Sequence, residues 1–125
     1  MSTTIKITNC DNEILLIAYP AAAPTKSYTL AHVKSGNSNS VSVTATISAG
    51  TYAAPQIQDG VNGPLNKTYD VNLPAGSYKL ITAGINWGGP ANFTFTVNNG
   101  SPQNYSAASG DGVAWTPSLT DLTIS

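Results

Sequence analysis

The residues best suited to chemistry in this sequence are two tryptophans set among glycine, asparagine and aspartate. Trp87 lies between Asn86 and a Gly-Gly pair, and Trp115 follows Asp111-Gly112. An aromatic ring beside amide or carboxylate groups suits a sugar, which has apolar C–H faces and polar hydroxyls but no charge. A second interpretation is that both rings cap one end of the core. The sugar-binding interpretation predicts a ligand site made of Trp87, Trp115, Asn86, Asp111, Asp59 and Asn62.

Groups that could carry catalysis are scarce. His32 is the single histidine, Glu13 the single glutamate and Cys10 the single cysteine. A nucleophilic pair would require Cys10, beside a turn, to reach His32 within a strand. Asp59 and Asp111 could act as the paired carboxyls of a glycosidase, but each precedes a glycine, and turn formation accounts for both. We therefore expect no enzymatic activity and no catalytic residue.

Metal ligands are also few. Calcium prefers about six to eight oxygen ligands, and the side chains that could supply them are Asp11, Asp59, Asn62, Asn66 and Asp111. These residues form no spaced motif, and a single histidine with a single cysteine offers too little for zinc. We expect no cofactor, with calcium kept as the alternative.

The charge composition restricts the partners. Only 9% of the residues are charged, with five lysines and no arginine, against about 25% in an ordinary globular protein. No basic stripe exists to neutralise phosphates, so nucleic acid is excluded as a partner. No apolar run approaches the ~20 residues of a transmembrane helix. The N-terminus lacks the apolar core of a signal peptide, so we expect either cytoplasmic synthesis or removal of an upstream leader.

Period-2 alternation of apolar and polar residues dominates the chain. Val41 to Ser48 alternates strictly, and Phe93 to Val97 does the same. Glu13 to Tyr19 contains four consecutive apolar residues, which is typical of a strand buried on both faces. Thr51 to Gln58 is expected as a weaker strand, at an edge or bulge because Pro55 has no N–H. Together these patterns predict one all-β domain over residues 1–125, an antiparallel β-sandwich of about ten short strands.

Successive reversals of an antiparallel chain fall at alternate ends of a sandwich. At the turn end we expect Pro20 to Lys26, Ala49-Gly50, Pro74 to Gly76 and Asn99-Gly100. At the opposite loop end we expect Cys10 to Asn12, Ser35 to Ser40, Asp59 to Lys67, Asn86 to Pro90 and Ala107 to Ala114. The second group is longer and richer in glycine and asparagine, so the ligand site is predicted at the loop end.

Residues Tyr69 to Gly100 contain V-N-L-P-A-G-S-Y-K-L, a glycine-rich loop and F-T-F-T-V-N-N-G. This segment resembles the central strands of jelly-roll carbohydrate-binding modules. The resemblance implies a lectin-like jelly-roll sandwich that binds a glycan, with Trp87 and Trp115 as contacts. Two other functions fit the composition. Neutral, Thr- and Ser-rich strands also suit a membrane-acting toxin of the cytolysin kind, and a low net charge permits a self-assembling structural protein or homo-oligomer.

Overall fold

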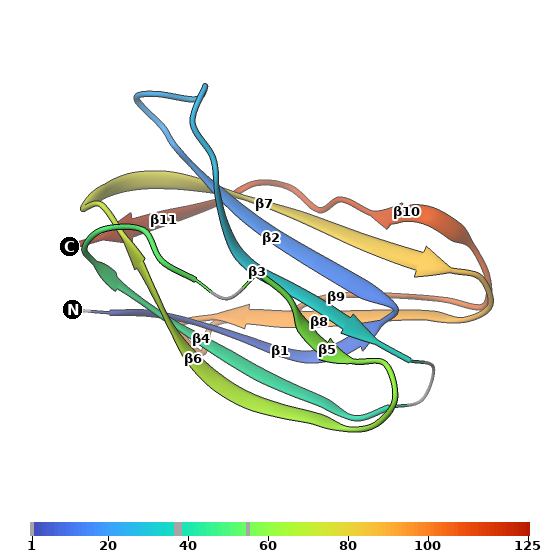
Figure 1. Cartoon of the computed structure of the whole chain (residues 1–125). Helices are drawn as coiled ribbons and strands as arrows, with labels where there is room; N and C mark the ends of the chain where they lie inside the picture. The colour runs from blue at the N-terminus through green and yellow to red at the C-terminus, as the bar shows by residue number, and fades with distance from the viewer. Residues whose placement is uncertain (1, 37–38, 55) are drawn as a thin grey trace.

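The computed structural model describes residues 2–36, 39–54 and 56–125, and none of these residues forms a helix. Within these described residues eleven strands form two sheets, and the sheets face each other as layers (Figure 1). The strands are β1 (Thr3–Asp11), β2 (Glu13–Pro20), β3 (Tyr28–Ser35), β4 (Val41–Ala49), β5 (Gln58–Gly60), β6 (Leu65–Leu73), β7 (Gly76–Trp87), β8 (Ala91–Val97), β9 (Gln103–Ala107), β10 (Asp111–Trp115) and β11 (Thr120–Ile124). The predicted all-β sandwich is confirmed.

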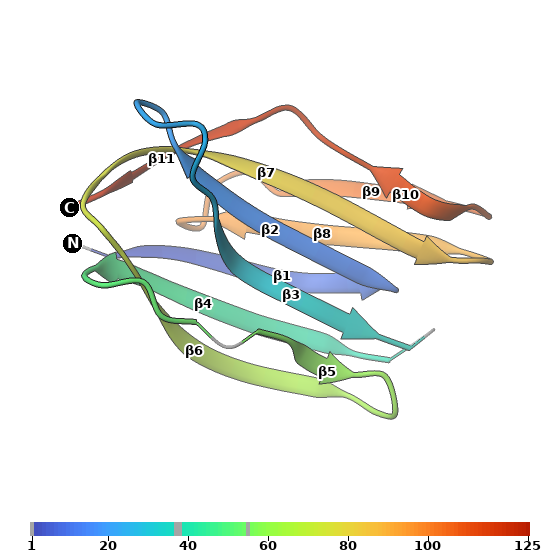
Figure 2. The same cartoon turned by 45° about the horizontal axis from the view of Figure 1, so that its top comes forward.

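The first sheet has the order β6-β4-β1-β8-β9, and the second has the order β10-β7-β2-β3-β5, with β11 also paired to β7. Figure 2 shows the two layers after rotation. Strands β4 and β6 pair in parallel, as do β3 and β5, so the expectation of purely antiparallel pairing is wrong at these two places. Parallel neighbours need a crossover of about a dozen residues or more. Residues 50–64 supply it between β4 and β6, and residues 36–57, which include β4, supply it between β3 and β5.

That crossover also replaces an expected strand. Between Thr51 and Gln58 the described residues make only an isolated bridge, from Ala53 to Asn72, before the short strand β5. The edge or bulge expected at Pro55 lies outside the described residues, as does part of the loop expected at Ser35 to Ser40.

The core lies between the sheets and follows the predicted alternation. In β4, Val43 and Ile47 are fully buried, whereas Thr44 and Thr46 are partly exposed on the other face. Near the loop end the core is aromatic, with the rings of Phe93, Tyr105 and Trp115 stacked together. Gly84 makes room for Phe93, because a Cβ atom there would lie 2.8 Å from its ring.

The strand registers place the connections at the two ends as predicted. At the loop end Asp11 pairs with Asn92, Asp111 with Trp87, and Ser35 with Gly60. The connections there are shorter than expected, because the strands extend into them: residues 61–64, 88–90 and 108–110 suffice to join β5 to β6, β7 to β8 and β9 to β10. Several predicted loop residues therefore lie at strand ends. No helix in the described parts of the chain has the length and apolar character to span a membrane.

Substituting Gly84 by alanine should destabilise the fold by about 1–3 kcal/mol, because the added methyl group overlaps the Phe93 ring in a packed core. Urea denaturation measures the change. Gly63→Ala is the matched control, since no atom lies within 4 Å of the added Cβ at that position. Equal stability of the Gly84 variant and the control would contradict this account of the aromatic core.

Candidate functional site

Trp87 is the last residue of β7 and points away from the core. Along β7 the residues Leu80, Thr82 and Asn86 are buried, so the alternate positions, Trp87 included, form the outer face of the second sheet. The Trp87 side chain is 49% exposed. Its indole Nε1 donates to Glu13 Oε2 at 2.7 Å, and its backbone N donates to Asn12 Oδ1 at 2.8 Å. The ring is therefore accessible, with its indole N–H held by Glu13 and its backbone held by Asn12.

Glu13 connects Trp87 to His32 across three adjacent strands. Glu13 Oε1 lies 2.9 Å from Nε2 of His32, and the two side chains are only 14% and 24% exposed. Desolvation raises the pKa of Glu13, but hydrogen bonds from His32 and Trp87, with the positive charges of His32 and Lys34, outweigh it. The net effect lowers the pKa, so the carboxylate stays ionised as an acceptor for the indole.

Asn12 links the row formed by Trp87, Glu13 and His32 to the backbones of β3 and β7. It is 5% exposed, and its backbone N donates to Ile85 O at 3.2 Å while its backbone O accepts from Ser35 N at 2.7 Å. Its side chain accepts from Trp87 N and donates from Nδ2 to Ser35 O at 3.4 Å. The turn between β1 and β2 is thereby tied to both β7 and β3.

Asn86 and Asp111 lie beside Trp87 but differ in their surroundings. Asn86 is 1% exposed, and its Nδ2 donates to Gly89 O at 2.8 Å and to Gly110 O at 2.7 Å, which joins two neighbouring turns. Asp111 is exposed and pairs with Trp87 in the β10–β7 register. Asn86 thus braces the site from inside, whereas Asp111 offers a carboxylate at its surface.

The two tryptophans have different environments. Trp115 is partly buried, and its ring stacks on Phe93 at 6.0 Å with an interplanar angle of 14° and on Tyr105 at 6.2 Å with 17°. It packs against the core, as the second interpretation of the tryptophans expects. Trp87 alone of the two presents its ring on the outer surface.

The structure separates Asp59 and Asn62 from the other predicted residues. Asp59 lies in β5, and β2 and β3 stand between β5 and β7. Its Oδ1 accepts from Val61 N at 3.0 Å, and Asn62 is exposed in the following turn. The structure therefore brings together Trp87, Asn86 and Asp111 and leaves Asp59 and Asn62 at the opposite edge of the sheet.

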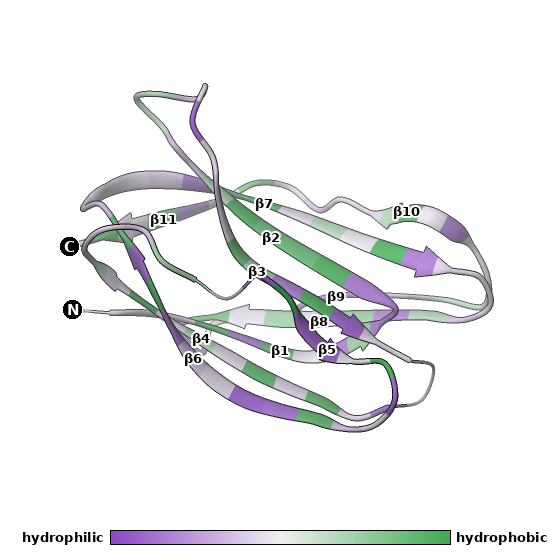
Figure 3. Cartoon of the chain, viewed as in Figure 1, coloured by the Kyte–Doolittle hydropathy of each residue, from purple (hydrophilic) through white to green (hydrophobic). Residues whose placement is uncertain are grey.

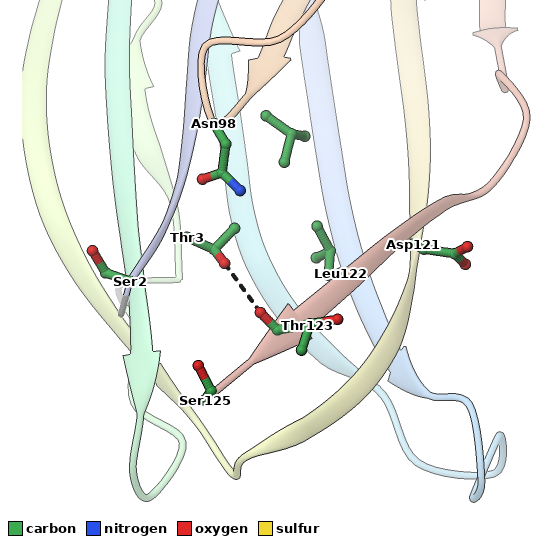
Figure 4. A pocket seen from close by; sticks show the side chains of 8 residues that line it. Ser2, Thr3, Asn98, Asp121, Leu122, Thr123 and Ser125 are labelled. Carbon is green, nitrogen blue, oxygen red and sulfur yellow. Dashed lines mark hydrogen bonds between the residues drawn. The ribbon is translucent and has the colours of Figure 1, made fainter.

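Two hollows lie at the ends of the sandwich. The loop-end hollow has a volume of about 380 Å³ and is lined by Asn9, Cys10, Asp11, Asn39, Ser40, Pro90 and Asn92. Desolvation raises the pKa of Asp11. The turn-end hollow, about 360 Å³, is lined mainly by hydroxyl and amide side chains and by Asp121 (Figure 4). There Thr3 Oγ1 donates to Thr123 O at 3.3 Å.

Cys10 and His32 lie on different sides of the second sheet. The Cys10 thiol is buried in the core and donates to the carbonyl oxygens of Asn12 and Val33, and burial raises its pKa. His32 lies on the outer face beside Glu13. Among the residues that the structure describes, no three or more His, Cys, Asp or Glu side chains cluster as metal ligands.

Comparison with family models, with curated proteins and with solved structures found no match to this chain. The ring of Trp87 and the loop-end hollow are thus the features from which its function has to be inferred. Sequence reasoning placed Trp87 in the site but missed Glu13, His32 and Asn12, because the pattern of one strand does not say which strands lie beside it.

Replacing Asn12 by alanine should destabilise the protein by about 1–3 kcal/mol, because Trp87 N and Ser35 O both lose their side-chain partner. Urea denaturation gives the difference. The exposed Asn62→Ala should stay within about 0.5 kcal/mol of the wild type. A similar small effect for both variants would show that the Asn12 side chain does not hold the turn.

The Glu13 carboxylate should stabilise the fold in a pH-dependent way. Its pKa is lowered in the folded protein, so its contribution is present at neutral pH and is lost as the pH falls through the folded value. We expect Glu13→Gln to cost about 1–3 kcal/mol at neutral pH and much less in acid, where both proteins carry an uncharged side chain. Denaturation curves across the acid range test this, with Asp59→Asn as the control. A cost that does not change with pH would refute the role of the charge.

Proposed function

We propose that this protein is a non-enzymatic, lectin-like carbohydrate-binding protein whose site lies at the loop end. The observation that carries the proposal is the half-exposed ring of Trp87, held by Glu13 through its indole N–H. A fixed aromatic face can stack on the C–H face of a sugar without first losing conformational freedom, and this limits the entropic cost of binding.

The polar groups around the ring suit hydroxyls. The exposed carboxylate of Asp111 lies opposite Trp87 in the register and can accept hydrogen bonds from a sugar. On the other side of the loop end, the hollow beside Asp11 is lined by three asparagines, and a planar amide both donates and accepts. This set binds neutral polyhydroxylated molecules better than anions, because it contains carboxylates and amides and no lysine.

The sequence adds further support. Residues Tyr69 to Gly100 form β7, β8 and part of β6, and they are the segment that resembles jelly-roll carbohydrate-binding modules. Assignment to the jelly-roll type belongs to the same proposal. The near-neutral surface, with a net charge of −1, is also compatible with an uncharged ligand.

A glycan screen followed by titration of the best-binding sugar tests the proposal. The wild type should bind at least one glycan, and Trp87→Ala should weaken binding at least about tenfold, which corresponds to ~1.4 kcal/mol of lost stacking. Binding should change little with salt, since the ligand is neutral. No binding of the wild type to any glycan, with calcium or with a chelator, would contradict the function.

Two further variants make this test specific to the proposed ring. Leu119→Ala removes another exposed apolar side chain, 53% accessible and outside the loop-end site, and should leave glycan affinity unchanged. Glu13→Gln keeps the indole ring but replaces its charged hydrogen-bond acceptor by a neutral one, so the ring is held less firmly. Glycan affinity should therefore fall by less than in Trp87→Ala. If Leu119→Ala lost binding as strongly as Trp87→Ala, the site would not be at the loop end.

A further inference from the structure

The loop-end hollow owes much of its polar lining to a bulge in β1. Ile7 faces the core, so strict alternation along the strand would turn Asn9 and Asp11 inward as well. The register of β1 on β8 shifts between Ile7 and Asn9, and beyond this bulge Cys10 faces the core instead. Bulges that re-aim side chains are common beside functional sites. Asn9 and Asp11 thereby lie on the outer face of the first sheet, where they line the hollow.

Hydrogen bonds orient two of the three amides that line the hollow. Asn39 Nδ2 donates to the backbone oxygens of Gly60 and Val61, both at 3.0 Å. A carbonyl oxygen can only accept, so the amino end of Asn39 must face these two groups, and its Oδ1 is left without them as partners. Asn9 Nδ2 donates to Thr94 Oγ1 at 3.0 Å. Both amides therefore have their amino groups occupied and their oxygens available as acceptors.

Asp11 adds a carboxylate that has no counter-charge. Its partner across the β1–β8 pair is Asn92, whose side chain is neutral and exposed. Within residues 2–36, 39–54 and 56–125 no ion pair involves Asp11. Desolvation raises its pKa, which means that the folded protein does not stabilise the ionised form. Hydroxyl groups of a ligand would supply the hydrogen-bond donors that this carboxylate lacks, and bonds to a charged acceptor are stronger than those to a neutral one.

A single residue connects the hollow to the surroundings of Trp87. β1 ends at Asp11 in the first sheet, β2 begins at Glu13 in the second, and Asn12 alone joins them. This turn is hydrophilic, in contrast to the hydrophobic middle of β2 (Figure 3). Asn12 holds the backbone of Trp87, and Glu13 holds its indole. Facing sheets lie about 10 Å apart, so one sugar ring, which is smaller than that spacing, cannot contact both outer faces, whereas a chain of several rings can.

We propose that the ligand is an oligosaccharide that passes over the β1–β2 turn, with one sugar stacked on Trp87 and another in the loop-end hollow, where Asp11 accepts hydrogen bonds from its hydroxyls. This inference rests on the proposed function and adds to it the size of the ligand and a second contact. The hollow, about 380 Å³, has the volume of a small-molecule pocket, which is about 300–1,000 Å³, and accommodates one sugar ring. Two contacts on one chain raise its affinity, because the second contact forms within the complex.

Calorimetric titration with sugars of increasing length tests the inference. The probes are glucose, mannose, xylose and N-acetylglucosamine, each as the monosaccharide and as its linear oligomers up to the hexasaccharide. In at least one series the affinity of the wild type should rise at least about tenfold from the monosaccharide to the hexasaccharide. A chelator is present throughout, so that no metal ion can act in place of the hydroxyl contacts. Absence of a gain with length in every series, or a gain that requires added calcium, would overturn the inference.

Variants assign the gain to the hollow. Asp11→Ala should weaken hexasaccharide binding about tenfold and leave the monosaccharide unchanged, because only the longer chain reaches Asp11. Asp11→Asn, which keeps the shape without the charge, should show a smaller loss. Asp70→Ala is the matched control, since it removes an exposed carboxylate from β6 of the same sheet, toward the turn end, and should keep the full gain.

The same titrations separate this inference from the proposed function. Trp87→Ala should weaken the binding of short and long sugars alike, because the ring contributes to both. A wild-type gain that persists in Asp11→Ala, or is lost equally in Asp70→Ala, would overturn the role of the hollow. Sugar binding that depends on Trp87 but does not strengthen with length would leave the proposed function standing and overturn the inference alone. Cooperative urea unfolding of each variant confirms that it is folded.

Discussion

Asn12 uses all four of its polar groups to hold the end of β2 between β3 and β7. Buried backbone groups that lose their partners are costly, so this residue stabilises the loop end where the chain leaves one sheet for the other. The position of Trp87 depends on it, because Asn12 fixes the backbone of Trp87 and Glu13 fixes the indole. A rigid ring on the surface therefore results from a buried amide beneath it.

Two tryptophans with similar neighbours in sequence serve different purposes. Trp115 stacks on Phe93, and the absence of a Cβ at Gly84 leaves room for the Phe93 ring. Trp87 lies at an outward position of β7, where 49% of its surface is exposed to solvent. The two rings differ because the register of β10 on β7 shifts between Val113 and Trp115, so that Trp115 pairs with the inward Gly84, whereas Trp87 keeps an outward position.

The protein combines two kinds of surface on one neutral scaffold. The outer face of the first sheet is hydroxyl-rich and suits solvent, whereas the outward positions of β7 on the second sheet include Ile81, Ile85 and Trp87. Only 9% of the residues are charged, so apolar burial and hydrogen bonding, rather than electrostatic attraction, would govern what this protein binds.

The sequence by itself determined the all-β class, most of the strands, the division of the connections between two ends and the prominence of Trp87. Alternation is local, so Val41 to Ser48 reveals its buried face without any knowledge of its neighbours. Only the tertiary structure decided the parallel pairings of β4 with β6 and β3 with β5, the inward packing of Trp115 and the row of Trp87, Glu13 and His32. These features depend on which strands lie side by side, and strand adjacency arises from long-range pairing that no single segment encodes.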